Sequence, residues 1–97
     1  MNDKEMKVER FRELNKNVTH GKIVFTGSSL MEMFPINKLL EEHNDPTVIY
    51  NRGIGGFISA ELLDVIDVCV LQLEPSRVFI NIGTNDLSDS RIPVQHL

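Results

Sequence analysis

Three short turns in this sequence carry groups that could act together in acyl transfer. Each turn contains glycine and follows a run of apolar residues that predicts a buried strand. Ser29 offers a hydroxyl, Gly56 an unhindered backbone N–H group and Asn85 a side-chain amide. A nucleophile with hydrogen-bond donors aimed at the same point is the arrangement of an acyl-transfer site with an oxyanion hole.

The elements around these turns predict that the three groups meet. Residues 22–26, 47–50 and 77–82 read as short buried strands, because β-branched and aromatic side chains are frequent in them. Helical patterns separate the strands, and this alternation implies parallel βαβ crossovers in an α/β fold. The carboxyl ends of parallel strands lie at one edge of the sheet, where ligands bind. The three turns are therefore expected to converge.

The sequence predicts four helical segments, at residues 1–17, 30–34, 36–43 and 58–73. The first has apolar residues at Phe11 and Leu14, and Val18 follows its end, a spacing typical of an amphipathic helix on the protein surface. Pro35 separates the second segment from the third, because proline disrupts a helix interior. The last segment contains Cys69, which we expect to be buried, as free cysteines usually are.

Each candidate residue also has a purely structural interpretation. Serine is a preferred N-cap residue, so Ser28 or Ser29 could simply cap the following helix. Gly56 could serve only its turn, and asparagine is common enough in turns that Asn85 could do the same. Arg52 could attract an anionic substrate, although a solvated surface arginine is the more common case.

Composition and charge exclude several classes of function. The net charge of −4 gives no electrostatic basis for nucleic-acid binding. No apolar run approaches the ~20 residues required to span a bilayer. Histidine, cysteine and carboxylate residues do not cluster at ligand spacings, so we expect no metal and no other cofactor. Residues 53–58 also fail as a dinucleotide fingerprint, because Ile58 stands where the last glycine belongs.

The remaining composition is that of a globular domain. Hydrophobic residues make up 41% of the chain and charged residues 25%, values that argue against disorder. A single cysteine leaves no internal disulfide, which fits a reducing compartment. The charged, mixed N-terminus does not resemble a secretory signal. We therefore expect a cytoplasmic protein.

Three sequence blocks resemble those of the SGNH (GDSL-type) hydrolases. They are Gly-Ser-Ser-Leu at 27–30, Asn-Arg-Gly-Ile-Gly-Gly at 51–56 and Gly-Thr-Asn-Asp at 83–86. Each follows a predicted strand, and their order is that of the family. The resemblance implies a three-layer, flavodoxin-like α/β sandwich that hydrolyses esters. It implies Ser29 as nucleophile, with the Gly56 N–H, the Asn85 side chain and the Ser29 N–H as oxyanion donors.

The chain departs from the family pattern at two points. Ser28 stands where the family usually has aspartate, which affects support of the loop more than the chemistry. The family takes its general base from an Asp-x-x-His block, and none occurs in these 97 residues. His20, His43 and His96 each read as solvent-exposed, and only His96 follows the third predicted strand. Without an imidazole base, a serine hydroxyl is a poor nucleophile at neutral pH.

Together these observations predict that residues 1–97 are the N-terminal portion of one SGNH-hydrolase-like domain, with three strands of a larger sheet. The family resemblance implies serine-dependent hydrolysis of small carboxylic esters, such as acylated sugars or short-chain lipids, through an acyl-enzyme. The alternative is an inactive fragment or a noncatalytic binding module on the same fold. A partial domain exposes a sheet edge and apolar faces, so self-association or strand exchange is expected.

Overall fold

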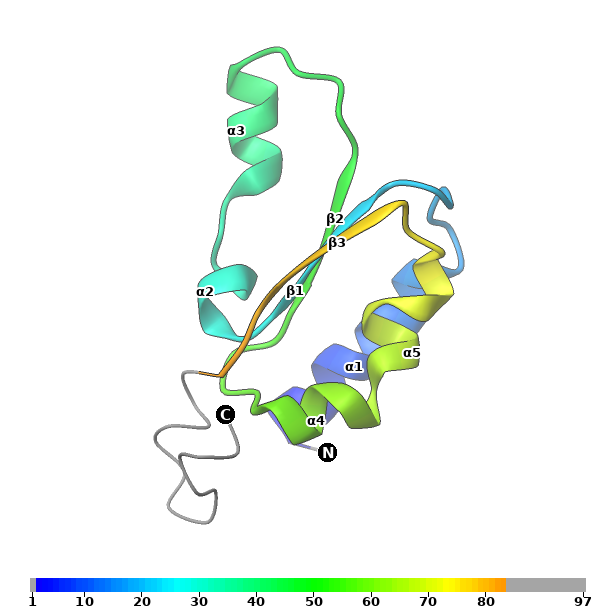
Figure 1. Ribbon diagram of the computed structural model, residues 1–97, viewed down its shortest axis with the longest axis vertical. Helices are drawn as coiled ribbons and strands as arrows, with labels where there is room; N and C mark the ends of the chain where they lie inside the picture. Colours follow the sequence, from blue (N-terminus) through cyan, green and yellow to red (C-terminus); the bar gives the residue numbers. More distant parts are fainter. Residues whose placement is uncertain (1, 84–97) are drawn as a thin grey trace.

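The computed structural model of the protein describes residues 2–83, which form one parallel sheet with helices on both sides (Figure 1). The strands are β1 (Ile23–Gly27), β2 (Ile49–Gly53) and β3 (Arg77–Asn81), in the order β2-β1-β3. Helices α2 (Ser29–Glu32) and α3 (Ile36–Glu42) lie on one side, and α1 (Asp3–Asn15), α4 (Ser59–Asp64) and α5 (Ile66–Cys69) on the other. This order is that of flavodoxin-like sheets, which confirms the predicted fold class.

β1 is the central strand and pairs along its whole length with both neighbours. The register places Gly27 opposite Gly53 in β2 and Asn81 in β3. All three strands therefore finish at the same edge of the sheet, beside the start of α2 and the loop that leads to α4 (Figure 1). This is the edge at which the sequence predicted the three turns to meet.

The hydrophobic core lies between the sheet and the layer formed by α1, α4 and α5. Its buried members are Val8, Ile54, Phe57, Leu62, Val68 and Cys69. Cys69 is buried as predicted, and this burial raises the pKa of its thiol. Burial of apolar surface by these side chains is the main force that holds the helical layer on the sheet.

Helix α1 contacts the core through a face that the sequence predicted only in part. Val8 and Asn15 are buried and Phe11 is half-buried, whereas Leu14 is 44% exposed. Asn15 can occupy a buried position because its Nδ2 group donates a hydrogen bond of 2.7 Å to the Val68 carbonyl oxygen. The spacing of apolar residues placed Leu14 on the buried face of the helix, because such spacing cannot reveal a buried asparagine. In the structure, Asn15 is buried and Leu14 is exposed.

The second strand begins and ends later than predicted. The sequence predicted residues 47–50, but Asn51 and Arg52 continue the ladder and Gly53 completes it. Asparagine and glycine favour turns, so the strand appeared to end at Tyr50. Pairing with β1 outweighs that local preference.

The helix predicted over residues 58–73 is divided into α4, α5 and a 3₁₀ turn at Leu71–Leu73. Val65 and Val70 separate these pieces, with φ angles of −123° and −138°. Both are β-branched, which lowers helix propensity, and both pack against the core. None of the helices within residues 2–83 has the length and apolar character needed to cross a lipid bilayer.

The two edge strands differ in how accessible their outer sides are. On the side of β2 that faces away from β1, the Asn51 carbonyl oxygen accepts a 3.2 Å hydrogen bond from Arg52 Nη1. On the same side, the Gly53 N–H group donates to Asn51 Oδ1 over 2.9 Å. Along β3, by contrast, Phe79 and Ile80 are 49% and 53% exposed. Within residues 2–83, β3 is therefore the edge strand that is accessible for pairing with a further strand.

Candidate active site

Ser29 is the first residue of α2 and lies just beyond the carboxyl end of β1. The turn that precedes it is fixed from both sides. The Ser28 N–H group donates to the Asn81 carbonyl oxygen over 3.0 Å, and the Gly27 carbonyl oxygen accepts from the Ile54 N–H group over 2.9 Å. Ser29 itself is exposed, so its hydroxyl is accessible at the edge of the sheet.

The two serines occupy different positions in α2. Ser28 is the N-cap residue, and it is buried, but its side chain makes no capping hydrogen bond. Ser29 lies in the first helical turn, so it is not an N-cap. Neither hydroxyl therefore caps the helix. The Ser29 N–H group belongs to the first turn, whose N–H groups have no partner within a helix.

Asn51 anchors α2 to β2. Its Nδ2 group donates a hydrogen bond of 2.6 Å to the Met31 carbonyl oxygen, while its Oδ1 accepts from the Gly53 N–H group. At Gly53 the two elements come so close that a Cβ atom would lie 2.8 Å from the Glu32 Cα. The sequence did not reveal this role, because asparagine before glycine reads as a turn residue.

We expect Asn51→Ala to lower the free energy of unfolding by about 1–3 kcal/mol, because two backbone groups lose their partner. Urea denaturation of the purified protein measures this loss. Asn37→Ala, at an exposed position of α3, is the matched control and should stay within about 0.5 kcal/mol of the parent. An equal effect of the two substitutions would contradict the anchoring role of Asn51.

The glycine turn adjoins the start of α2. The Phe57 N–H group donates to the Ile54 carbonyl oxygen over 3.3 Å, and Gly56 has a φ angle of +83°. Glycine adopts such an angle without a steric penalty. A Cβ atom built on Gly55 would lie 3.8 Å from the Ser29 Cβ. The second predicted turn is therefore a neighbour of the predicted nucleophile.

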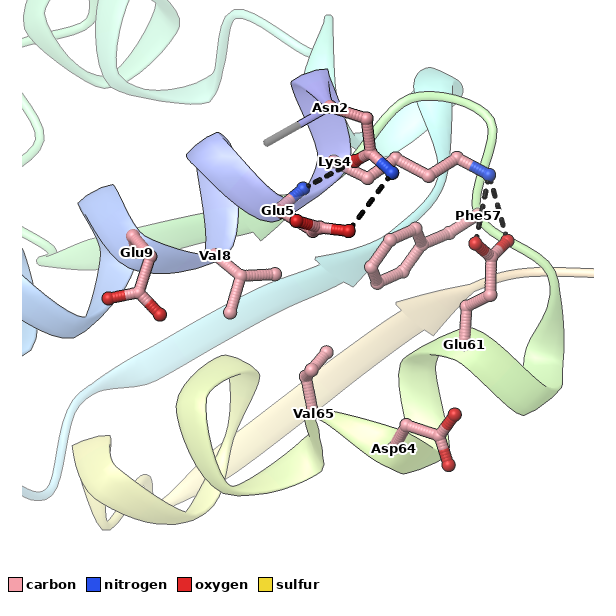
Figure 2. A pocket seen from close by; sticks show the side chains of 9 residues that line it. All are labelled: Asn2, Lys4, Glu5, Val8, Glu9, Phe57, Glu61, Asp64 and Val65. Atoms are coloured by element: carbon pink, nitrogen blue, oxygen red, sulfur yellow. Dashed lines mark hydrogen bonds and ion pairs between the residues drawn. The ribbon is translucent and has the colours of Figure 1, made fainter.

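Two lysines of α1 form ion pairs on either side of the glycine turn. Lys4 Nζ lies 2.9 Å from Glu61 of α4 and 5.8 Å from the centroid of the Phe57 ring (Figure 2). Lys7 Nζ lies 2.6 Å from Glu32 of α2. Partly exposed pairs of this kind contribute only about 0–1 kcal/mol each to stability. Their main effect is to fix the position of α1 relative to the turn.

A cavity of about 310 Å³ lies beside this turn, between α1 and α4 (Figure 2). Val8, Phe57 and Val65 provide its apolar lining, and acidic side chains of both helices provide most of the charged lining. Phe57 directly follows Gly56, the predicted oxyanion donor. The cavity therefore adjoins the candidate site.

The described residues bring Ser29 and the glycine turn together, but no histidine is beside them. His20 precedes β1, at the opposite end of the strand from Ser29, and its Nδ1 lies 2.7 Å from Glu74 Oε2. His43 follows the last residue of α3, which extends away from α2 (Figure 1). Two further residues singled out from the sequence, Asn85 and His96, lie outside the described residues.

The expectation that Arg52 is a solvated surface residue is wrong. The residue is buried, with only 5% of its surface exposed. Its Nε group donates to Asn15 Oδ1 over 3.0 Å, and its guanidinium carbon lies 5.1 Å from the centroid of the Phe11 ring. Burial lowers the pKa of the guanidinium, which nevertheless stays protonated. Contacts with an aromatic face and an amide make this burial tolerable.

The chain is similar to several solved structures. No protein-family model matches the chain, and no curated protein matches it significantly. A solved structure provisionally described as a platelet activating factor from Streptococcus pneumonia is 32% identical over 97% of this chain, with a TM-score of 0.79. An acylhydrolase from Bacteroides fragilis, also provisionally described, is 25% identical over 88%, with a TM-score of 0.71. A GDSL-like lipase from Bacteroides thetaiotaomicron is 25% identical over 84%, with a TM-score of 0.69.

These similarities extend over most of this chain but over less than half of each neighbour. The chain spans 42%, 42% and 41% of the lengths of the three solved structures. The strand order and the three sequence blocks agree with this similarity. The chain therefore has the fold of an SGNH (GDSL-type) hydrolase and corresponds to the N-terminal portion of such a protein.

Proposed function

We propose that the protein hydrolyses small carboxylic esters through an acyl-enzyme formed on Ser29. The observation that carries this proposal is the position of Ser29. It is exposed in the first turn of α2, beyond the carboxyl end of the central strand and next to the glycine turn. The neighbours named as an acylhydrolase and a GDSL-like lipase support it. Short-chain lipids and acylated sugars are the proposed substrates.

In the proposed reaction, a general base removes the proton of Ser29 Oγ as this oxygen attacks the ester carbonyl carbon. The charge that develops on the carbonyl oxygen is stabilised by the Gly56 N–H, the Asn85 side-chain amide and the Ser29 N–H. The base passes its proton to the departing alcohol and then activates the water that hydrolyses the acyl-enzyme. The proposed base is a histidine, oriented by an aspartate, from an Asp-x-x-His block that these 97 residues do not contain.

Labelling with a fluorophosphonate tests this proposal, because such probes react with activated serines. The purified protein is treated with the probe, and the site of modification is read by intact mass and peptide mapping. A label on Ser29 is expected when the protein includes the Asp-x-x-His block, and the 97-residue chain alone should react far more slowly. A label on Ser28 or elsewhere, with Ser29 unmodified, would contradict the proposed nucleophile.

A second candidate function is that of a noncatalytic module that associates with another chain. The exposed edge of β3, with Phe79 and Ile80 about half exposed, favours it. Unpaired backbone and apolar side chains on an edge strand promote pairing with a second chain. Under this proposal the 97-residue chain forms dimers in sedimentation velocity experiments. Ile80→Lys should return it to a monomer, whereas Leu63→Lys, at an exposed position of α4, should not.

A further inference from the structure

A second cavity of about 310 Å³ lies between α1, α2 and β2, and its lining is cationic. Lys7, Arg10 and Arg52 contribute three positive charges to it, and Glu32 contributes the one carboxylate. This surplus of positive charge occurs in a chain whose net charge is −4. We propose that this cavity binds a phosphate group.

Arg52 supplies the donors at the inner end of the cavity. The residue is only 5% exposed, and no carboxylate within residues 2–83 forms an ion pair with it. Its Nε donates to Asn15 Oδ1 and its Nη1 to the Asn51 carbonyl oxygen. Its Nη2 makes no hydrogen bond to any described residue. A guanidinium has five N–H donors, so three remain available for an oxyanion.

The orientation of Arg52 is fixed before any ligand binds. The Phe11 and Tyr50 ring centroids lie 5.1 Å and 5.6 Å from its guanidinium carbon. Among the described residues, no fully buried side-chain nitrogen lacks a partner. Arg52 lines the cavity, so we place the exposed part of its guanidinium, with Nη2, at the cavity surface. A preorganised donor group loses little conformational entropy when an anion binds.

The charges at the cavity mouth match a dianion. Glu32 forms an ion pair of 2.6 Å with Lys7, so these two charges compensate each other. Arg10 is exposed and makes no ion pair within residues 2–83, which leaves Arg10 and Arg52 as uncompensated cations. A phosphate group carries close to two negative charges at neutral pH. Arginine is also suited to bind phosphate oxygens through two N–H groups.

The cavity also has an apolar wall, formed by Phe11 and Leu14 of α1. Leu14 was predicted to lie on the apolar face of α1, but it is 44% exposed and lines this cavity instead. An apolar wall next to cationic donors can accept a phosphate monoester with an apolar body as well as free phosphate. The proposal requires only the phosphate group, and it does not depend on the proposed esterase activity or on Ser29.

The test is a titration of the ¹⁵N-labelled chain with sodium phosphate at constant ionic strength, followed by NMR. Saturable shifts are expected at the Arg52 Nε–H and Gly53 N–H signals, with a Kd of about 1 mM or tighter. Arg10→Gln should weaken binding at least about fivefold, because it removes a charged donor at an exposed position. Lys16→Gln removes the same charge from the C-cap residue of α1, outside the cavity, and should change the Kd by less than about twofold.

Non-saturating shifts spread over the surface would overturn the proposal, and so would equal weakening by Arg10→Gln and Lys16→Gln. A parallel titration with phenyl phosphate distinguishes the two sources of the group. Tighter binding of phenyl phosphate identifies an ester whose apolar body contacts Phe11 and Leu14. Equal binding of the two probes identifies free phosphate. Both of these outcomes support the site.

Discussion

Ser29→Ala is expected to lower kcat/KM for ester hydrolysis by at least about 10⁴-fold in a protein that includes the Asp-x-x-His block. The reason is that Ser29 is the proposed nucleophile, and the neighbouring Ser28 is buried. Ser29 is exposed, so removal of its hydroxyl should leave the urea midpoint unchanged. Hydrolysis of p-nitrophenyl acetate, measured together with urea denaturation, gives both quantities. Full activity of Ser29→Ala would exclude the proposed mechanism.

The neighbouring serine provides the matched control. Ser28 is 3% exposed, and its backbone N–H group, which alanine retains, donates to the Asn81 carbonyl oxygen. Ser28→Ala should therefore change stability by no more than about 1 kcal/mol and kcat/KM by less than about tenfold. If Ser28→Ala lost as much activity as Ser29→Ala, the nucleophile could not be assigned to Ser29.

Gly27→Ala is expected to prevent stable folding, with a loss of at least about 3 kcal/mol in the free energy of unfolding. Gly27 has a φ angle of +136°, which side chains rarely adopt. A Cβ atom at this position would also collide with the backbone of Asn81, whose carbonyl carbon would lie 2.7 Å away. The loss is a large part of the ~5–15 kcal/mol that stabilises a typical domain. Urea denaturation and far-UV circular dichroism measure it.

Gly21→Ala separates the two causes of this effect. Gly21 also has a positive φ angle, +83°, but a Cβ atom there would meet nothing within 4 Å. It should lose only the backbone strain, about 1–2 kcal/mol. The additional loss in Gly27→Ala then measures the close approach of β3 to the turn before Ser29. Equal losses in the two variants would show that β3 does not approach this turn closely.

Most of the fold could be predicted because its elements are local patterns. β1 and β3 consist mainly of β-branched and aromatic residues, and the structure places both within one residue of the predicted boundaries. The end of β2 could not be predicted, since Asn51 and Arg52 favour turns or solvent when considered alone. They form a strand because each finds partners in other elements. Pairing of this kind depends on the folded structure and leaves no periodic signal.

In the candidate site, too, local features could be predicted from the sequence, whereas contacts between distant residues could not. The glycine before Ser29 and the glycine turn were recognisable, because positive φ angles require glycine at particular positions. The supports of these turns were not recognisable. Lys7 and Glu32 form an ion pair although 25 positions separate them, and no property of either residue indicates its partner. Asn85 was singled out from the sequence and lies outside the described residues, so its role stays a prediction.

The unequal edges of the sheet give its assembly a direction during synthesis on the ribosome. The central strand β1 emerges first, and β2 can pair with it before β3 is made. The side chains of Arg52 and Asn51 then form hydrogen bonds with outer backbone groups of β2. These groups are therefore less accessible for pairing with segments that are synthesised later. β3 pairs on the other side of β1 and keeps its outer side open. We therefore expect a strand translated afterwards to pair beside β3, so that the sheet grows in the order in which the chain is synthesised.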